Sequence, residues 1–285
     1  MFETLTARGF EVRSESHASA ILEQDFPTAV GEIAEALRDF EIPITEIIGS
    51  GGGETQGTQR LRKALTAQGW KKTIFQVKKN IQIREKHGTG IQVELERDSA
   101  THEINHVKAF EGTGGSRLIA LEIEWNNKDP FFDRDLENFK RLHSEGAISV
   151  GIIITRGSSL QNNVWNYVFR YATEQNIQSF ADLERLNIET TGPKRKAIEA
   201  RINRPKNPVP FTHAWTDNFV NNKYGEAQTH WSKLITRIER GVGNPCPLLL
   251  IGLPDSIVKF DVNPVVEPVN VPEPEETEPT AEEPI

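Results

Sequence analysis

The segment Leu118-Ile-Ala-Leu-Glu-Ile-Glu-Trp125 decides the fold, together with the run Ala147-Ile-Ser-Val-Gly-Ile-Ile-Ile154 that follows it. The first segment is rich in β-forming residues and predicts a strand, and the second is mostly apolar and predicts a strand buried on both faces. Residues 130–146 between them predict a helix, with Pro130 near its start and Gly146 at its end. The apolar stripe of this helix comprises Phe132, Leu136, Phe139 and Leu142.

Strand, helix and strand at this length predict a βαβ crossover with a parallel strand pair. The fold class is therefore α/β, a mixed central sheet flanked by helices. Outward from this unit, apolar spacing predicts helices over residues 28–40 and 58–70. Residues 91–96 alternate as a half-buried strand does, and residues 247–253 predict another buried strand. The glycine-rich stretch 49–53 lacks the Gly-Lys-Ser/Thr ending of a phosphate-binding loop and is better interpreted as a turn.

The composition is that of a globular protein, because 36% of the 285 residues are hydrophobic and 26% are charged. No apolar run approaches the roughly 18–20 residues needed to cross a bilayer. The chain opens with neither a secretory nor a transit sequence, and a single cysteine, Cys246, cannot form an internal disulfide. We therefore expect a protein of the reducing cytoplasm.

Charge divides the chain into two parts. We expect a single domain over residues 1–260, with a basic insertion around 157–212, and a disordered acidic tail rich in Pro and Glu over 261–285. The tail holds seven glutamates and no Lys or Arg, so most of the net charge of −8 belongs to it. The remainder is close to neutral, and nucleic acid stays possible as a partner. A solubilising role is the better interpretation of the tail, and mimicry of DNA is the alternative.

Glu122 and Glu124 lie two residues apart on the predicted strand, so both carboxylates project from one face. Most such pairs lie on solvated faces. Here the hydrophobic neighbours make a solvated strand improbable, and buried carboxylates need a cation. Hard oxygen ligands without a nearby Cys or His cluster favour Mg²⁺ over Zn²⁺.

Three long segments carry a family resemblance. Ile119-Ala-Leu-Glu-Ile-Glu-Trp-Asn-Asn-Lys-Asp-Pro-Phe-Phe-Asp-Arg-Asp-Leu136, with the strand at 147–154, resembles the active-site core of the BglII/BstYI branch of type II restriction endonucleases. Thr229-His-Trp-Ser-Lys-Leu-Ile-Thr-Arg-Ile-Glu-Arg-Gly-Val-Gly-Asn-Pro-Cys-Pro-Leu-Leu-Leu-Ile-Gly252 is similar to that family's C-terminal helix and closing strand. The resemblance covers roughly residues 5–255, in the right order.

The resemblance implies the PD-(D/E)XK nuclease fold, which is restriction-endonuclease-like, and a homodimer acting on palindromic double-stranded DNA. It implies that Glu122 is the central Mg²⁺ ligand and that the backbone carbonyl of Ile123 is a further ligand. Glu124 stands where the family usually has Lys or Gln, and a carboxylate there can orient or deprotonate the attacking water.

Asn105 departs from the family pattern. The family carries an Asp in a context like His-Glu-Ile-Asp-His-Val-Lys, whereas this chain reads His102-Glu-Ile-Asn-His-Val-Lys108. The resemblance thus places Asn105 at the first metal-ligand position and among the catalytic residues, where a neutral amide holds Mg²⁺ less strongly than a carboxylate. Glu103, two residues earlier on the same strand face, is a candidate substitute.

The residues expected to contact DNA come from three places. Asn126 and Asn127 follow the metal strand, where the family's loop reaches base edges, although simple turn chemistry is the alternative. Three histidines could be considered as catalytic bases, namely His102, His106 and His143. None is spaced from a catalytic partner in a way that supports this role, so structural hydrogen bonding is the favoured interpretation. A basic run is expected to contact phosphates, and its members are Lys194, Arg195, Lys196, Arg201, Arg204 and Lys206. Two residues just before the C-terminal helix, Lys223 and Tyr224, are further candidates.

Three functions compete. A type II site-specific deoxyribonuclease, functionally paired with a DNA methyltransferase, is the leading hypothesis, in a form that Asn105 weakens or inactivates. A dimeric sequence-specific DNA-binding protein that no longer cleaves is the second, and a small-molecule binder that uses the two glutamates is the third. The recognition sequence cannot be read from these residues, and a site centred on GATC is a guess from the family.

Overall fold

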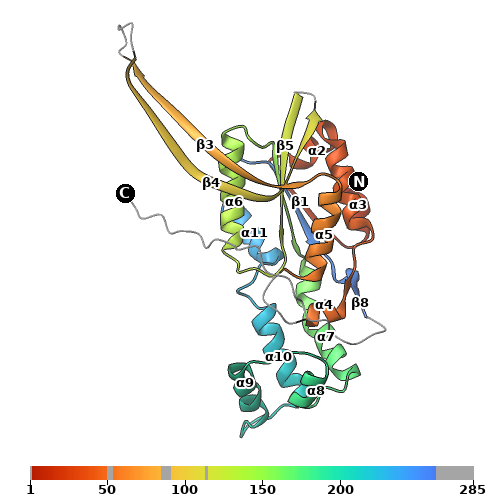
Figure 1. Ribbon diagram of the computed structural model, residues 1–285. Coiled ribbons are helices and arrows are strands. Elements are labelled where there is room, and N and C mark those ends of the chain that lie inside the picture. The colour runs from red at the N-terminus through yellow and green to blue at the C-terminus, as the bar shows by residue number, and fades with distance from the viewer. Residues whose placement is uncertain (1, 50–53, 85–90, 113–114, 261–285) are drawn as a thin grey trace.

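Figure 1 shows the protein as a computed structural model, which describes residues 2–49, 54–84, 91–112 and 115–260. The acidic tail predicted over 261–285 lies outside the described residues, as does most of the turn predicted at 49–53. Within the described part of the chain, no helix is both long enough and apolar enough to span a bilayer.

A six-stranded mixed sheet forms the centre of the molecule, as predicted. Its three inner strands, β5, β6 and β7, are mutually parallel, and β1, β4 and β3 add antiparallel strands at the two edges. The order across the sheet is β1 (Glu11–Glu15), β7 (Leu248–Leu253), β6 (Val150–Arg156), β5 (Gly115–Glu124), β4 (Ile91–Gly112) and β3 (Lys71–Arg84).

The predicted βαβ crossover is confirmed in β5, α6 (Phe131–Ser144) and β6. Pro130 precedes the first helical residue, and Gly146 adopts a positive φ of 71° just after the helix ends, a conformation that favours glycine. The predicted apolar stripe of α6 is fully buried against the sheet, where α11 (Trp231–Glu239) covers the same face.

Helices cover the opposite face as well. The prediction of helices at 28–40 and 58–70 is confirmed in α3 (Pro27–Arg38) and α5 (Gln56–Ala67). Each begins a little earlier than predicted, because Pro27 takes the first turn of α3 and the Thr55 hydroxyl caps α5 by accepting from Thr58 N at 3.3 Å. The other helices on this side are α1 (Phe2–Ala7), α2 (Ala18–Asp25), α4 (Ile44–Ile48) and α7 (Ser158–Glu174).

The insertion predicted around 157–212 is helical. It begins with α7, which packs into the larger core, and continues into a helical lobe, defined here as α8 (Phe180–Arg185), α9 (Gly192–Ile202) and α10 (Phe211–Lys223). α10 packs against both α7 and α9, and the helical lobe forms one end of the molecule in Figure 1. Near the chain's end, η1 (Asp255–Ile257) leads into β8 (Val258–Lys259), which pairs in parallel with β2 (Ile42–Pro43).

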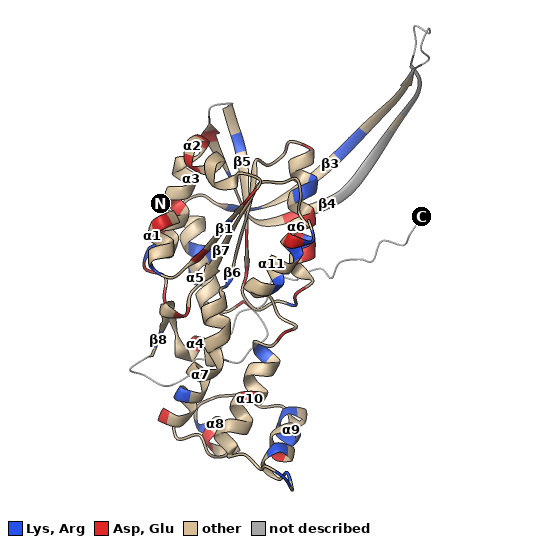
Figure 2. Ribbon diagram, turned by 180° about the vertical axis from the view of Figure 1, so that it is seen from behind, with Lys and Arg blue, Asp and Glu red and all other residues tan. Residues whose placement is uncertain are grey.

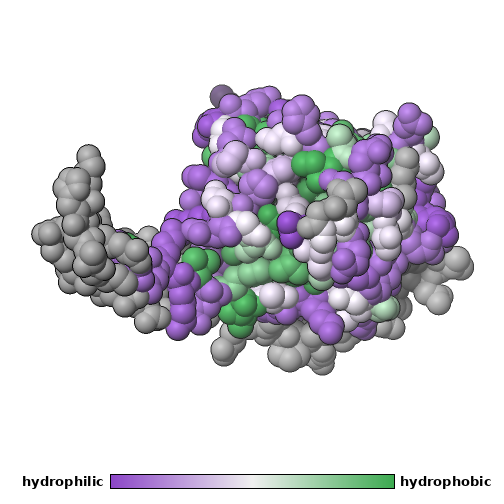
Figure 3. Space-filling model, turned by 90° about the horizontal axis from the view of Figure 1, so that it is seen from above, coloured by the Kyte–Doolittle hydropathy of each residue, from purple (hydrophilic) through white to green (hydrophobic). Residues whose placement is uncertain are grey.

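The strands β3 and β4 continue beyond the sheet as a two-stranded arm. The arm leaves the body at the end opposite the helical lobe, and Figure 3 shows apolar side chains where the arm meets the body. Among the side chains that the structure describes, the large apolar ones exposed on β3 and β4 are Ile74, Ile81, Ile83 and Leu95.

Gly151 on β6 sets how closely α6 can approach the sheet. A Cβ atom at this position would lie 2.4 Å from Cδ2 of Phe139 and 3.0 Å from Cδ2 of Leu248. We expect Gly151→Ala to lower the free energy of unfolding by about 1–3 kcal/mol through overpacking. Gly31→Ala is the matched control, since no atom lies within 4 Å of its added Cβ and alanine favours the helix by about 1 kcal/mol. Urea denaturation of both variants measures the difference, and a Gly151→Ala protein as stable as the parent would contradict this packing.

Candidate active site

Glu122 and Glu124 point from β5 toward α6, on the same sheet face as the buried Ala120. Each glutamate is only 1% exposed. β5 is an inner strand, held by β4 on one side and by β6 on the other, so the backbone positions of both glutamates are fixed. The prediction that these glutamates are not on a solvated face is confirmed.

Asn105 on β4 holds Glu122 with two hydrogen bonds. Its backbone N–H donates to Oε1 of Glu122 over 2.9 Å, and its side-chain Nδ2 donates to Oε2 over 2.8 Å. Asn105 and Glu122 are therefore neighbours, as predicted. The amide, however, presents its N–H₂ group to the carboxylate, so Asn105 satisfies Glu122 where an aspartate would repel it.

Asp135 brings a third buried carboxylate into the site. It comes from α6, is 1% exposed, and its Oδ1 accepts from Nε of Arg134 over 3.0 Å. The guanidinium of Arg134 also lies 3.7 Å from Oε1 of Glu124. The sequence analysis missed Asp135, although a signal was present. Its position is three residues after Phe132 and four before Phe139, on the apolar face of the helix.

Burial raises the pKa values of all three carboxyl groups, and the charge of Asp135 raises those of both glutamates further. Burial, followed by the charge of Asp135, raises the pKa of Glu122 to about 8 against the opposing hydrogen bonds of Asn105. The same two causes raise the pKa of Glu124 well above its usual range. Burial also raises the pKa of Asp135, although Arg134 opposes the shift. The site therefore disfavours full ionisation of the three carboxyl groups unless a cation balances their charge.

Asn127 contacts the site directly. Its Nδ2 donates to Oε2 of Glu124 over 2.9 Å, and the hydroxyl of Thr155 donates to the backbone oxygen of Glu124 over 2.6 Å. The neighbouring Asn126 is partly buried, and its Oδ1 accepts no hydrogen bond from the described residues. Asn127 therefore links the segment after β5 to the carboxylate cluster, and base contacts by either asparagine stay a prediction.

The donor set fits a hard divalent cation in its chemistry. Carboxylate oxygens are the ligands that Mg²⁺ prefers, and an added cation would relieve the repulsion that raises the pKa values. The described residues contain no group of three Asp, Glu, His or Cys side chains arranged to hold a metal ion as they stand. Both oxygens of Glu122 are engaged by Asn105 in this arrangement, so a cation would have to displace at least one of these hydrogen bonds. The Ile123 carbonyl as a ligand stays a prediction.

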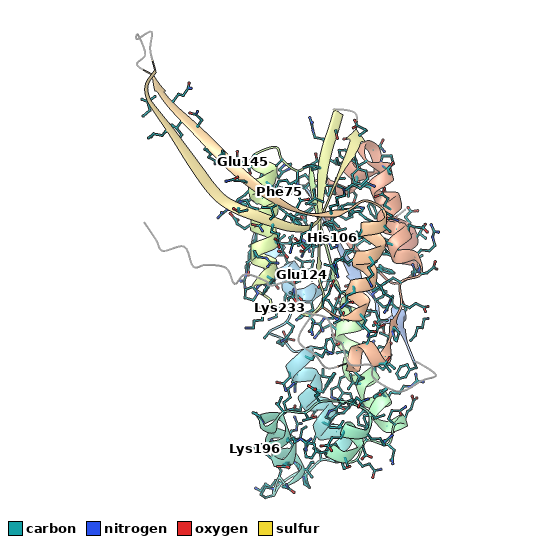
Figure 4. The ribbon with its side chains drawn as sticks, viewed as in Figure 1. Phe75, His106, Glu124, Glu145, Lys196 and Lys233 are labelled. Atoms are coloured by element: carbon teal, nitrogen blue, oxygen red, sulfur yellow. The ribbon has the colours of Figure 1, made fainter. Side chains whose placement is uncertain are left out.

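The basic residues 194–196 lie on α9, well away from the carboxylates. Figure 2 shows the Lys and Arg residues on α9 in the helical lobe, and Figure 4 shows Lys196 at the opposite end of the molecule from the arm, with Glu124 between them. Arg195 is tied to Oε1 of Glu184 over 2.5 Å, and Arg201 pairs with Asp217. Lys194, Lys196, Arg204 and Lys206 are exposed.

Lys223 and Tyr224 face inward in this conformation. Nζ of Lys223 donates to the backbone oxygens of Ile47 and Gly49, and burial, followed by the charge of Lys194, lowers its pKa to about 7. Tyr224 is 1% exposed and donates its hydroxyl hydrogen to Ile47 O over 2.8 Å. Both residues join α10 to α4, so contact with DNA would require them to move.

The histidines make structural hydrogen bonds, as expected. His102 lies 2.8 Å from Oδ1 of Asn138, His106 lies 3.3 Å from the carbonyl of Leu121, and His143 lies 3.1 Å from the carbonyl of Ile148. Glu103 is exposed and pairs with Lys72 over 2.6 Å. The expectation that Glu103 could replace the missing aspartate is therefore not supported, because its carboxylate faces Lys72 on the neighbouring strand.

Comparison with known protein families identifies a match over most of the chain. The family model described as restriction endonuclease BglII/BglIII covers residues 10–253, which includes every strand of the central sheet and every carboxylate of the site. No curated protein matches the chain.

The raised pKa of Glu122 predicts a pH-dependent stability. An acid whose folded-state pKa of about 8 exceeds its ordinary value of 4.5 stabilises the fold fully below pH 4.5, and that contribution is lost as pH rises toward 8. In buffer with a chelator, the unfolding free energy of the parent should fall relative to Glu122→Gln by up to about 1.4 kcal/mol per pH unit. Urea denaturation at pH 5, 6, 7 and 8 measures this difference. Parallel curves for the two proteins would mean that Glu122 is ionised throughout.

Proposed function

Because the chain belongs to the BglII/BglIII restriction endonuclease family, we propose that it is a type II site-specific deoxyribonuclease that hydrolyses double-stranded DNA with Mg²⁺. The observation that carries the proposal is the buried group formed by Glu122, Glu124 and Asp135, which lies within the matched region. Action on a palindromic site as a homodimer, and pairing with a DNA methyltransferase, belong to the same proposal. A recognition sequence centred on GATC remains a guess.

Each side chain has a role in this mechanism. Glu122 would hold the cation, with the Ile123 carbonyl as a further ligand, and the bound ion would polarise the scissile phosphate and the attacking water. Glu124 would accept the proton of that water, since it projects from the same strand face as Glu122 and a bound cation would favour its ionised form. Arg134 balances part of the charge of Asp135 and Glu124, and Asn127 orients the carboxylate of Glu124.

Asn105 limits the proposed activity. A neutral amide at this position adds no charge for the cation, and its N–H₂ group occupies an oxygen of Glu122 that the cation needs. The alternative function is therefore a dimeric sequence-specific DNA-binding protein that does not cleave. The same geometry supports both functions, and they differ in whether Mg²⁺ can displace the Asn105 amide.

DNA contacts are proposed at two places. Asn126 and Asn127 follow β5 beside the carboxylates, where amide side chains can read an adenine edge. The exposed cations of α9, Lys194 and Lys196, would add contacts to phosphates outside the cleaved step, together with Arg195 if it leaves Glu184. Such contacts would add affinity without sequence information.

Plasmid digestion tests the proposal directly. We would incubate the protein with a plasmid of known sequence in Mg²⁺ and in Mn²⁺, sequence the cut ends, and measure DNA binding in Ca²⁺ by gel shift. Discrete fragments with one terminal sequence support the nuclease. Specific binding without cleavage supports the DNA-binding alternative, and the absence of both would contradict both functions.

Asn105→Asp gives the sharpest prediction. The substitution removes the hydrogen bond from the amide to Glu122 and adds a negative oxygen, so Mg²⁺ binds more tightly and the cleavage rate rises by up to about a thousandfold, which corresponds to about 4 kcal/mol. Binding to DNA in Ca²⁺ should change little. Glu103→Gln is the matched control on the same strand, and its rate should equal that of the parent. Equal, vigorous cleavage by the parent and by Asn105→Asp would contradict the assignment of this position.

A further inference from the structure

Arg156 is a buried arginine at the carboxyl end of β6, the strand next to the one that carries the glutamates. It is 1% exposed, and no carboxylate of the described residues forms an ion pair with it. Its Nε and Nη2 both donate to the backbone oxygen of Thr229, over 3.3 and 2.7 Å. Its Nη1 makes no hydrogen bond to a described residue, and the guanidinium lies 5.0 Å from the centre of the Tyr224 ring.

A buried cation without a counter-charge is costly to the fold. Burial lowers the pKa of Arg156 to about 10, which reports how unfavourable this environment is for its charge. An apolar side chain of similar volume would avoid the cost of removing a guanidinium from water. Packing alone therefore does not account for an arginine here. Its two hydrogen bonds to the Thr229 carbonyl indicate that the guanidinium serves to hold that carbonyl in place.

Those hydrogen bonds begin a continuous path to the proposed active site. The backbone N–H of Thr229, whose oxygen Arg156 binds, donates to the backbone oxygen of Asn127 over 2.7 Å. Asn127 in turn donates from Nδ2 to Oε2 of Glu124. A second link joins the same two segments, because Asp129 N–H donates to Ala227 O over 2.9 Å.

We infer that Arg156 is a positioning residue for the proposed reaction, which holds Thr229 and, through it, Asn127 against Glu124. The path joins Arg156 to the segment 126–129, in which Asn126 and Asn127 are the expected DNA contacts, and to the proposed base Glu124. If DNA displaces this segment, the hydrogen bond from Asn127 to Glu124 changes with it. This inference rests on the proposed function, but the anchoring itself can be measured without it.

Hydrogen exchange tests the anchoring. In the full-length protein, Arg156→Met should speed amide exchange of Asp129 and Thr229, whose N–H groups make the two links, by at least tenfold, while the amides of β5 and β7 stay protected. Arg156→Lys should give an intermediate rate, because an ammonium can donate to the Thr229 carbonyl. Arg141→Met on the exposed face of α6 is the control, with no change expected. Unchanged exchange in the two Arg156 variants would overturn the inference. If Arg156→Met does not fold, Arg156→Lys alone carries the test.

Kinetics test the link to catalysis, in the Asn105→Asp background so that cleavage is measurable. Arg156→Lys should lower kcat at least tenfold with little change in KM. Asn127→Ala should lower kcat at least as much and also raise KM, because Asn127 is a proposed base contact. The double variant should be no slower than the slower single one, since both break one path. Additive losses would overturn the path from Arg156 to Glu124. Absence of cleavage in the background protein itself would instead count against the proposed function, and the exchange result would still decide the anchoring.

Discussion

The burial of three carboxyl groups around one arginine is the constraint on which the rest of the site depends. Glu122 and Glu124 on β5 and Asp135 on α6 are all removed from water, and Arg134 balances only part of their charge. Buried charges are typical of functional sites, and buried carboxylates there bind a cation or transfer a proton. The parallel order of β5, β6 and β7 makes the arrangement possible, because it collects the carboxyl ends of adjacent strands at one edge.

Asn105 and Arg156 lie on the two strands that flank β5, and each is linked by hydrogen bonds to one of its glutamates. Asn105, on the neighbouring β4, satisfies Glu122 with amide hydrogens and so lowers the demand for a cation. Arg156, on the neighbouring β6, fixes the segment that carries Asn127. In the proposed mechanism, Asn105 would govern whether an ion can enter, and Arg156 would govern how Glu124 is presented to a water. Strength of metal binding and orientation of the base are separable properties in this arrangement.

Much of the fold follows from local sequence patterns. The βαβ unit was predictable because α6 carries an apolar stripe at helical spacing, β5 is rich in β-forming residues, and β6 is an almost continuous apolar run. The close pairing of Asn105 with Glu122 required the family resemblance, since seventeen residues separate them and only strand register joins them. Asp135 and Arg156 were missed because their importance comes from burial and from partners far along the chain, which spacing does not report. The inward orientation of Lys223 and Tyr224 escaped prediction for the same reason.

The central claim is that the buried carboxylates form a cation site. Equilibrium binding of Mn²⁺, followed by electron paramagnetic resonance, tests it without DNA and without turnover. The account predicts saturable binding to the parent that is at least tenfold weaker in Glu122→Gln and unchanged in Glu103→Gln, whose carboxylate pairs with Lys72 on the surface. Equal Mn²⁺ affinity in the parent and in Glu122→Gln would contradict the account, because the ion would then be held elsewhere.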